Sequence, residues 1–234
     1  MLRKFNLYRS FFILLFLTII SFTALAQQHY DLNAGWMLID SAKVHQQGKE
    51  ISVASFNTSN WYKATVPGTV LTSLINDNIY PEPLYGENNR PDKISDSLCR
   101  TSYWYRTVFI VPKNYQGKQI ILNFDGINYA AQVWVNGNNV GEIKGAFARG
   151  IFDITKYVQS GKCAVLAVLI SPQPHPGVPH EHTLKMEWGA MVESQQLMAL
   201  HFFVRLAGIG FLLFVIEIRE YGKRFFFLLQ DLFK

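Results

Sequence analysis

Four histidines in the C-terminal third of the sequence are the side chains that could most readily bind a metal ion. They are His175, His180, His182 and His201. His180 and His182 lack the i, i+4 spacing with which a helix presents two imidazoles to zinc, and no cysteine completes a ligand set. Residues 170–183, ISPQPHPGVPHEHT, alternate proline and histidine and favour a rigid loop, with a metal site as the alternative. We expect no metal and no cofactor.

The acidic side chains show no arrangement typical of general acid–base catalysis. Glu82, Glu87 and Asp125 fall on expected loops, where carboxylates are usually solvated, and no spacing marks two of them as a pair. The sequence also contains no nucleophile elbow, no glycine-rich phosphate loop and no Cys-His arrangement. Because these residues identify no catalytic site by themselves, we assign no catalytic residue.

Charge and cysteine content narrow the possible partners and the compartment. The formal net charge is +5, but lysine and arginine are spread along the chain and form no run, which argues against a nucleic-acid partner. Cys99 and Cys163 are the only cysteines. In an oxidising compartment they could form a disulfide, and two separately buried thiols are the alternative.

Residues 1–26 have the pattern of a secretory signal peptide. Three basic residues within the first nine precede an apolar run over 11–22, and Ala24-Leu25-Ala26 supplies a small-residue cleavage site. An uncleaved anchor is the alternative, although the run is shorter than the ~20 residues that span a bilayer. We expect export to the periplasm or the cell exterior and a mature chain that begins at Gln27.

From Gln27 to about Pro179 the sequence is typical of an all-β domain. Short runs rich in valine, isoleucine and aromatic residues alternate with glycine, proline, asparagine and aspartate. Because no βαβ rhythm is present, antiparallel strands of this length predict a two-sheet sandwich or jelly roll. The best strands are expected at Tyr103–Val111, Gln119–Phe124, Ala131–Val135 and Ala164–Ile170.

One hairpin is predicted from its turn residues. Asn136-Gly137 tolerates positive φ at both turn positions, so residues 133–143 should form a tight hairpin. Val133 and Val135 alternate with Trp134, which predicts that one face of this hairpin meets a core and the other carries the indole.

Two helical segments interrupt the strand pattern. An apolar face at helical spacing predicts a helix over Thr69–Asn78 that covers an end of the sandwich. A shorter helical turn is expected at 154–158, where Asp153 or Thr155 could cap the free backbone N–H groups.

Five segments of the exported part, in this order, resemble a known family: VPGTV, YPEPLYGENN, SYWYRTVF, LNFDGINYAAQVWVNGNNVGEIKGAF and FDITKYV. Together they span about residues 30–183. This part is similar to the N-terminal sugar-binding domain of glycoside hydrolase family 2, which holds β-galactosidases, β-mannosidases and exo-β-glucosaminidases. The segment YPEPLYGENN is most similar to the mannosidase and glucosaminidase branch.

The resemblance implies a galactose-binding-domain-like jelly roll over residues 27–185 that packs on an immunoglobulin-like domain and a TIM barrel. The barrel of such enzymes carries the two glutamates of a retaining mechanism, which hydrolyses terminal β-O-glycosidic bonds in carbohydrate metabolism. The resemblance also implies that Asn88, with Glu87 beside it, contacts the carbohydrate at the rim of the sugar site. The alternative is that Asn88 only orders its loop.

Two other functions stay open. A free-standing carbohydrate-binding module would use exposed aromatic side chains such as Trp134. A membrane-tethered interaction protein would be anchored by residues 198–218, although Arg205 interrupts that span and a buried arginine costs roughly 2.5–3.5 kcal/mol on insertion scales. We therefore expect no genuine membrane span after signal cleavage.

The resemblance stops after Lys185, and residues 186–234 show neither strand rhythm nor turn signals. The family continues here with a Trp-Asp-Trp motif. Residues 207–212 can be encoded as GCT-GGG-ATT-GGA-TTC-CTG, and regrouping from the last base of the first codon gives Trp-Asp-Trp-Ile-Pro. Loss of one A from AAA-AAT-GGA at Lys185 would cause that shift. We therefore expect a frameshifted tail over 186–234 with no genuine domain, and a chain that lacks the barrel and is inactive alone.

Overall fold

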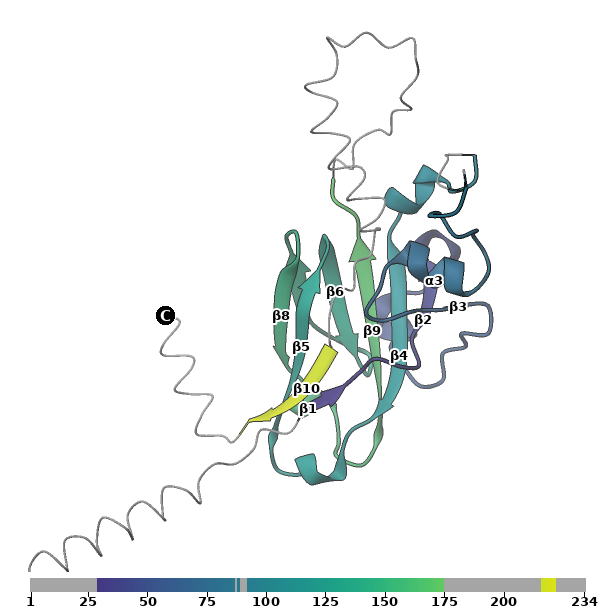
Figure 1. Cartoon of the computed structure of the whole chain (residues 1–234). Helices are drawn as coiled ribbons and strands as arrows, with labels where there is room; N and C mark the ends of the chain where they lie inside the picture. Colours follow the sequence, from purple (N-terminus) through teal and green to yellow (C-terminus); the bar gives the residue numbers. More distant parts are fainter. Residues whose placement is uncertain (1–28, 87, 89–91, 175–215, 222–234) are drawn as a thin grey trace, which may run out of the picture.

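The computed structural model describes residues 29–86, 88, 92–174 and 216–221, which form a sandwich of two antiparallel sheets (Figure 1). Sheet A has the strand order β1 (His29–Asp31), β10 (Ile216–Tyr221), β5 (Gln119–Ile127) and β8 (Ala148–Asp153). Sheet B has the order β3 (Tyr62–Lys63), β2 (Met37–Asp40), β4 (Tyr103–Ile110), β9 (Cys163–Ser171), β6 (Ala130–Val135) and β7 (Asn138–Lys144). The predicted all-β class is confirmed. The expected signal peptide over 1–26 lies outside the described residues.

The helical elements are short and lie in the connections between strands. They are η1 (Ser41–Lys43), α2 (Gly48–Ile51), α3 (Val70–Asn76), η2 (Asp96–Cys99), η3 (Lys113–Tyr115) and η4 (Thr155–Tyr157). Helix α3 confirms the predicted helix over Thr69–Asn78, because Thr69 is its N-cap and accepts a backbone N–H of the first turn at 2.9 Å. It ends where Asn78 adopts φ 59° and the Ile79 N–H bonds the Leu74 carbonyl at 2.8 Å.

The predicted turn at 154–158 is the 3-10 helix η4; its N-cap is Ile154, and of the two side chains expected to cap it, Asp153 accepts an N–H of the turn whereas Thr155 does not. The Asp153 carboxylate accepts the Thr155 N–H at 2.9 Å and also the Thr155 hydroxyl. The hydroxyl oxygen of Thr155 accepts the Ile120 N–H at 2.8 Å, which fastens the turn to β5. Burial alone would raise the pKa of Asp153, but the hydrogen bonds from Thr155 and Gln119, with a nearby lysine, outweigh it and lower the pKa.

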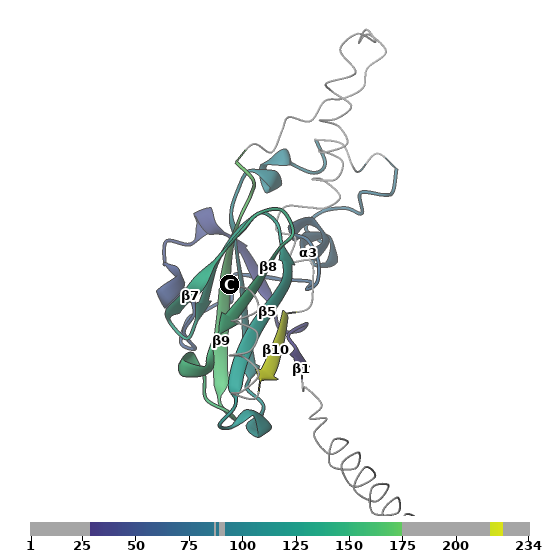
Figure 2. The same cartoon turned by 90° about the vertical axis from the view of Figure 1, so that its left-hand side faces the viewer.

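The main core lies between the two sheets and is built from residues between Leu32 and Ile170. Its largest fully buried side chains include Tyr105, Phe124 and Leu166, from strands of both sheets. Strand β6 shows the alternation that the sequence predicts, because Val133 and Val135 are buried in this core. The two-sheet arrangement is clearest from the side of sheet A, where β8, β5, β10 and β1 lie next to one another (Figure 2).

A second apolar cluster covers the outer face of sheet B. It consists of Ile39, Ile51, Trp61, Trp104 and Ala167, with partly buried neighbours that include Phe56 and Trp134. The segment that contains α2 is held over this face by Arg106, whose Nε donates to the Ile51 carbonyl and whose guanidinium NH₂ donates to the Val53 carbonyl, both at 2.9 Å. Sheet B is therefore packed on both faces. The strand pattern of the sequence indicates a core on one face of the sheet only.

The hairpin between β6 and β7 forms as predicted. Asn136 and Gly137 have φ of 47° and 83°, the positive values that a two-residue hairpin turn needs. The Asn136 side chain fixes the turn, since its Oδ1 accepts the Val165 N–H and its Nδ2 donates to the Tyr157 carbonyl, both at 2.8 Å. The same asparagine therefore allows the turn and ties it to β9 and η4.

Strand β10 corrects one expectation about the C-terminal segment. The sequence shows no strand rhythm after Lys185, yet residues 216–221 pair antiparallel with β5 along Gln119–Phe124 and with β1 along His29–Asp31. The pairing to two neighbours supplies a backbone ladder that sequence periodicity does not reveal. The rest of the expected tail, 186–215 and 222–234, lies outside the described residues.

Candidate functional site

The loops of the sandwich gather at its two ends. Strand pairing places the start of β4 beside the end of β9, because Tyr103 pairs with Ile170, and the start of β6 beside Ser171. We call this the exit end, since β9 leaves the sandwich there; it also carries the connection between α3 and β4 (Figure 1). The β6–β7 turn lies at the opposite end, which we call the hairpin end.

The loop over residues 80–88 projects from the exit end and is organised by its own hydrogen bonds. The Glu82 carbonyl accepts the Tyr85 N–H at 3.3 Å, and the Glu82 carboxylate accepts the Leu84 N–H at 3.3 Å. Gly86 has φ 58°, a left-handed conformation that glycine adopts without steric cost. Leu84 and Tyr85 are 81% and 80% exposed, so this ordered loop presents two large apolar side chains to solvent.

Asn88 is half-buried and takes part in ordering the loop. Its Nδ2 donates to the Glu82 carbonyl at 3.0 Å, and its backbone N–H donates to the Tyr85 carbonyl at 3.3 Å. An amide group can make four hydrogen bonds, so this contact leaves capacity for a ligand. Glu87, the second residue that the resemblance places at the sugar site, lies outside the described residues. A sugar contact by either residue stays a prediction.

A buried tyrosine lies beneath the exit-end loops. Tyr103 is 5% exposed, and burial, followed by the nearby Asp40 carboxylate and Tyr80, raises its pKa well above the ordinary value. The Asp40 carboxylate accepts the Ala42 N–H at 2.9 Å and the Thr101 hydroxyl at 3.1 Å. The two hydrogen bonds that Asp40 accepts from Ala42 and Thr101 tie the exit-end loops to β2, with Tyr103 packed beneath them.

Other residues singled out by sequence lie apart or cannot be placed. The four histidines are outside the described residues, and inside them no three His, Cys, Asp or Glu side chains come close enough to hold a metal ion. Cys99 is buried near the exit end, whereas Cys163 is exposed at the start of β9 beside Ile110. The two cysteines form no disulfide, and the alternative of two buried thiols is wrong for Cys163.

Trp134 is not an exposed platform for sugar stacking. Its indole is half-buried and lies against α2, so close that a Cβ added at Gly48 would overlap the ring. Its Nε1 is buried and has no hydrogen-bond partner. The sequence correctly put this side chain on the face away from the main core, but a second layer that sequence reasoning did not predict covers it.

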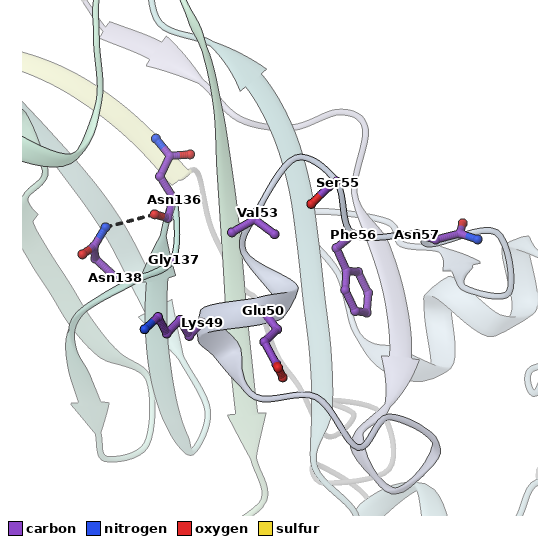
Figure 3. A pocket seen from close by; sticks show the side chains of 9 residues that line it. All are labelled: Lys49, Glu50, Val53, Ser55, Phe56, Asn57, Asn136, Gly137 and Asn138. Carbon is purple, nitrogen blue, oxygen red and sulfur yellow. Dashed lines mark hydrogen bonds between the residues drawn. The ribbon is translucent and has the colours of Figure 1, made fainter.

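An open hollow of about 780 Å³ lies at the hairpin end (Figure 3). One side consists of the turn residues 136–138, and the other consists of residues from the α2 segment: Lys49, Glu50, Val53, Ser55, Phe56 and Asn57. The Asn138 Nδ2 donates to the Asn136 carbonyl at 2.9 Å within the rim. Sequence reasoning missed this hollow because its two sides come from segments far apart in the chain.

The membrane interpretation gains no support from the described part of the chain. No helix there is long and apolar enough to cross a bilayer. Of the anchor over 198–218 that was the alternative interpretation, the structure describes only the last three residues, and these belong to strand β10.

Comparison with known sequences identifies relatives of this fold. A family model described as glycosyl hydrolase 2 galactose-binding domain-like matches residues 43–209. The mannosylglycoprotein endo-beta-mannosidase of Lilium longiflorum is 33% identical over 151 residues, which are 62% of this chain and 16% of that protein. The exo-beta-D-glucosaminidase of Streptomyces avermitilis is 31% identical over 130 residues, 54% of this chain and 14% of that protein. The chain thus spans a small part of the length of both relatives.

Solved structures share the sandwich. An exo-chitosanase of Amycolatopsis orientalis aligns with a TM-score of 0.59 and 24% identity over 83% of this chain and 21% of its own. A beta-D-mannosidase from Dictyoglomus thermophilum aligns with a TM-score of 0.56 and 19% identity over 84% of this chain and 23% of its own. At these identities the likeness establishes the fold. The family match over most of the sequence shows that the chain belongs to the glycosyl hydrolase 2 family, through that family's galactose-binding domain-like region.

Proposed function

We propose that these residues are the N-terminal sugar-binding domain of a family 2 glycosidase, and that the exit end forms part of the rim of its sugar site. The observation that carries this proposal is the loop over 80–88, which holds Leu84 and Tyr85 in solvent beside the amide of Asn88. Protein sites for small molecules combine apolar or aromatic surface with a few placed polar groups. The loop follows α3, which packs on the main core through Val70 and Leu74.

The proposed substrate class is a β-linked mannoside or glucosaminide. This choice is supported by two of the relatives, which are named as an endo-mannosidase and an exo-glucosaminidase. The proposed reaction is hydrolysis of the β-O-glycosidic bond by a retaining mechanism with two glutamates on a separate barrel domain. These 234 residues then bind sugar weakly and hydrolyse nothing by themselves.

A turnover assay tests the proposal that this chain binds sugar whereas a separate barrel domain carries the catalytic residues. The purified chain is incubated with a panel of aryl β-glycosides that includes the β-mannoside and the β-glucosaminide. We expect no release of the aryl group above the rate in buffer, because the two glutamates of the proposed mechanism belong to a separate barrel domain. Clear turnover would contradict the proposed role.

A titration followed by NMR tests the rim. With β-linked mannose and glucosamine disaccharides, we expect millimolar binding and shift changes centred on residues 80–88. Tyr85→Ala should remove those changes, because the aromatic face is lost. Ile151→Thr, at a residue of β8 that is 66% exposed and remote from the loop, serves as the control and should bind like the parent. Changes that persist in Tyr85→Ala would count against the rim.

The hollow at the hairpin end favours a second candidate, a carbohydrate-binding module that works without a barrel. Its amides, Lys49 and Glu50 surround apolar Val53 and Phe56, a combination suited to a sugar ring. The same titration separates the two candidates. Shift changes centred on residues 49–57 and 136–138, with micromolar affinity, would support the module and contradict the exit-end rim.

The frame of the C-terminal segment is part of the same proposal. Residues 186–234 are proposed to be translated one base out of register, with the family's Trp-Asp-Trp motif in the other frame over residues 207–212. The family match extends to residue 209 and so does not stop at Lys185, where the sequence analysis expected it to stop. The nucleotide sequence is the measurement that tests the reading frame. An uninterrupted frame at Lys185 with no barrel sequence in any frame downstream would contradict this part.

Export is proposed on the pattern of residues 1–26. Expression with intact N-terminal residues should yield a periplasmic or secreted product whose mass corresponds to a start at Gln27. A product retained at full length in the cytoplasm would contradict export and would leave the sugar-binding role to be judged by the titration.

A further inference from the structure

The two sides of the hollow at the hairpin end are fastened to each other by a buried serine. Ser52 is fully buried, and its hydroxyl donates to the Gly48 carbonyl at 2.6 Å and accepts the Gly137 N–H at 3.0 Å. The side chain of Asn136 also ties the turn to β9 and η4. The hollow is therefore a preformed feature of the fold, as most small-molecule sites are.

Lys49 is the charged group of the hollow that lacks a partner of opposite charge in the described part of the chain. It extends toward the β6–β7 turn (Figure 3), and its ammonium forms no ion pair with a described residue. The neighbouring Glu50 is occupied, because its carboxylate accepts the Gln47 N–H at 3.1 Å at the start of α2. The hollow thus offers a cation to a ligand.

More positive charge surrounds the hollow. The hairpin end is formed by four segments, residues 48–57, 111–119, 136–138 and 153–163. Together they contain five lysines and two acidic residues, Glu50 and Asp153. Lys113, Lys156 and Lys162 are exposed like Lys49, whereas Asp153 accepts hydrogen bonds from its own neighbours. Excess charge of one sign concentrates oppositely charged ligands at such a surface.

The shape and lining of the hollow suit a sugar ring better than a bare anion. Val53 and Phe56 supply apolar surface, and the volume of about 780 Å³ is within the range of small-molecule sites, roughly 300–1,000 Å³. The Nδ2 of Asn138 donates to the Asn136 carbonyl, and its Oδ1 can accept a sugar hydroxyl. A free phosphate or sulfate ion would meet the lysine but leave the apolar surface uncovered.

We infer that this hollow binds an acidic oligosaccharide. The carboxylate or sulfate of one sugar unit lies at Lys49, and the ring of that unit lies against Val53 and Phe56. Further acidic groups of the ligand lie near the exposed lysines around the hollow. This inference rests on the carbohydrate-binding module proposed for the same hollow and names its ligand; it does not depend on the exit-end rim.

Isothermal titration calorimetry of the full chain with a tetramer of galacturonic acid tests the inference. The fully methyl-esterified tetramer is the matched neutral ligand. We expect the acid to bind at least tenfold more tightly than the ester, and its affinity to fall between about 20 and about 200 mM NaCl because salt screens exposed charges. A sulfated tetrasaccharide is the second acidic probe. Binding of either acid supports the inference, and the stronger one identifies the preferred acidic group.

Lys49→Gln should weaken binding of the acid at least fivefold. Lys144→Gln is the matched control, because it removes the same charge from an exposed position of β7 near the exit end; it should bind like the parent. Near-UV circular dichroism establishes that both variants are folded. If Lys49→Gln is not, NMR shift changes in the unaltered chain decide: changes centred on residues 49–57 and 136–138 support the hollow, and changes centred elsewhere refute it.

Three results would overturn the inference: no binding of either acid, equal affinity for the methyl ester, or undiminished binding by folded Lys49→Gln. An oligonucleotide of the same charge that binds as tightly would also overturn it, because charge alone would then be sufficient. Neutral disaccharides that bind at the hollow without any gain for the acid would leave the carbohydrate-binding module in place and refute only the acidic ligand.

Discussion

Arg106 shows how one buried charge can hold a layer of the molecule in place. It is 5% exposed, burial lowers the pKa of its guanidinium, and two main-chain carbonyls of the α2 segment accept its hydrogen bonds. An arginine keeps its charge in such a place because its ordinary pKa is so high. Its planar donors can satisfy two carbonyls at once, which a lysine ammonium does less well.

Replacing Arg106 should therefore loosen the α2 segment. Arg106→Met keeps much of the side-chain volume but leaves the Ile51 and Val53 carbonyls without a donor, and we expect a loss of about 2–4 kcal/mol in the free energy of unfolding. Arg106→Lys should lose less. Urea denaturation followed by tryptophan fluorescence measures both. Lys144→Met, at an exposed position of β7, is the control and should change the stability by less than about 0.5 kcal/mol.

Asp153 predicts how stability changes in acid. The folded state lowers its pKa, so the carboxylate stabilises the fold above the pKa of the unfolded chain, and that contribution is lost as the pH falls through the folded value. Because the ordinary value is 3.8, the loss belongs below about pH 4. Asp153→Asn should therefore be less stable than the parent at pH 7, with a difference that shrinks below pH 4. Urea midpoints over pH 2.5–7 measure it, and a constant difference would contradict this assignment.

At the scale of elements, α2 packs closely against the β6–β7 hairpin at one glycine. An added Cβ at Gly48 would overlap the Trp134 ring. We expect Gly48→Ala to destabilise the protein by about 1–3 kcal/mol. In a Trp134→Leu background the same change should be clearly less costly, because the ring is gone. A double-mutant cycle from thermal or urea unfolding measures this coupling, and additive effects would show that the two residues do not press on each other.

Local patterns were enough for some elements and insufficient for others. The β6–β7 hairpin could be predicted because Asn136-Gly137 determines its own turn, and α3 because its apolar residues recur at helical spacing. The layer over sheet B and strand β10 could not, because both depend on partners distant in sequence. The candidate site divides in the same way. The loop with Asn88 could be placed from its motif. The exposure of Tyr85 and the hollow at the hairpin end needed the assembled fold.

At the scale of the whole molecule, we expect a thiol reagent to modify the two cysteines at different rates. Cys163 is exposed, whereas Cys99 is 2% exposed. A thiol reagent should therefore modify Cys163 within the mixing time and Cys99 only as the protein opens. By mass spectrometry the parent should show one fast site and one slow site, and Cys163→Ser should show only the slow site. Rapid modification of Cys99 in the native protein would contradict its burial.

Strand β10 is the last described strand to leave the ribosome or a translocation channel, and this affects how the protein folds during synthesis. The core residues that the structure describes all precede residue 171, so they can begin to pack together while β10 is still inside the machinery. Until residue 221 emerges, the edge of β5 is unpaired and β1 is unattached. An open edge of this kind invites pairing with other nascent chains, so the rate of chain delivery relative to the arrival of β10 decides how much of the protein aggregates.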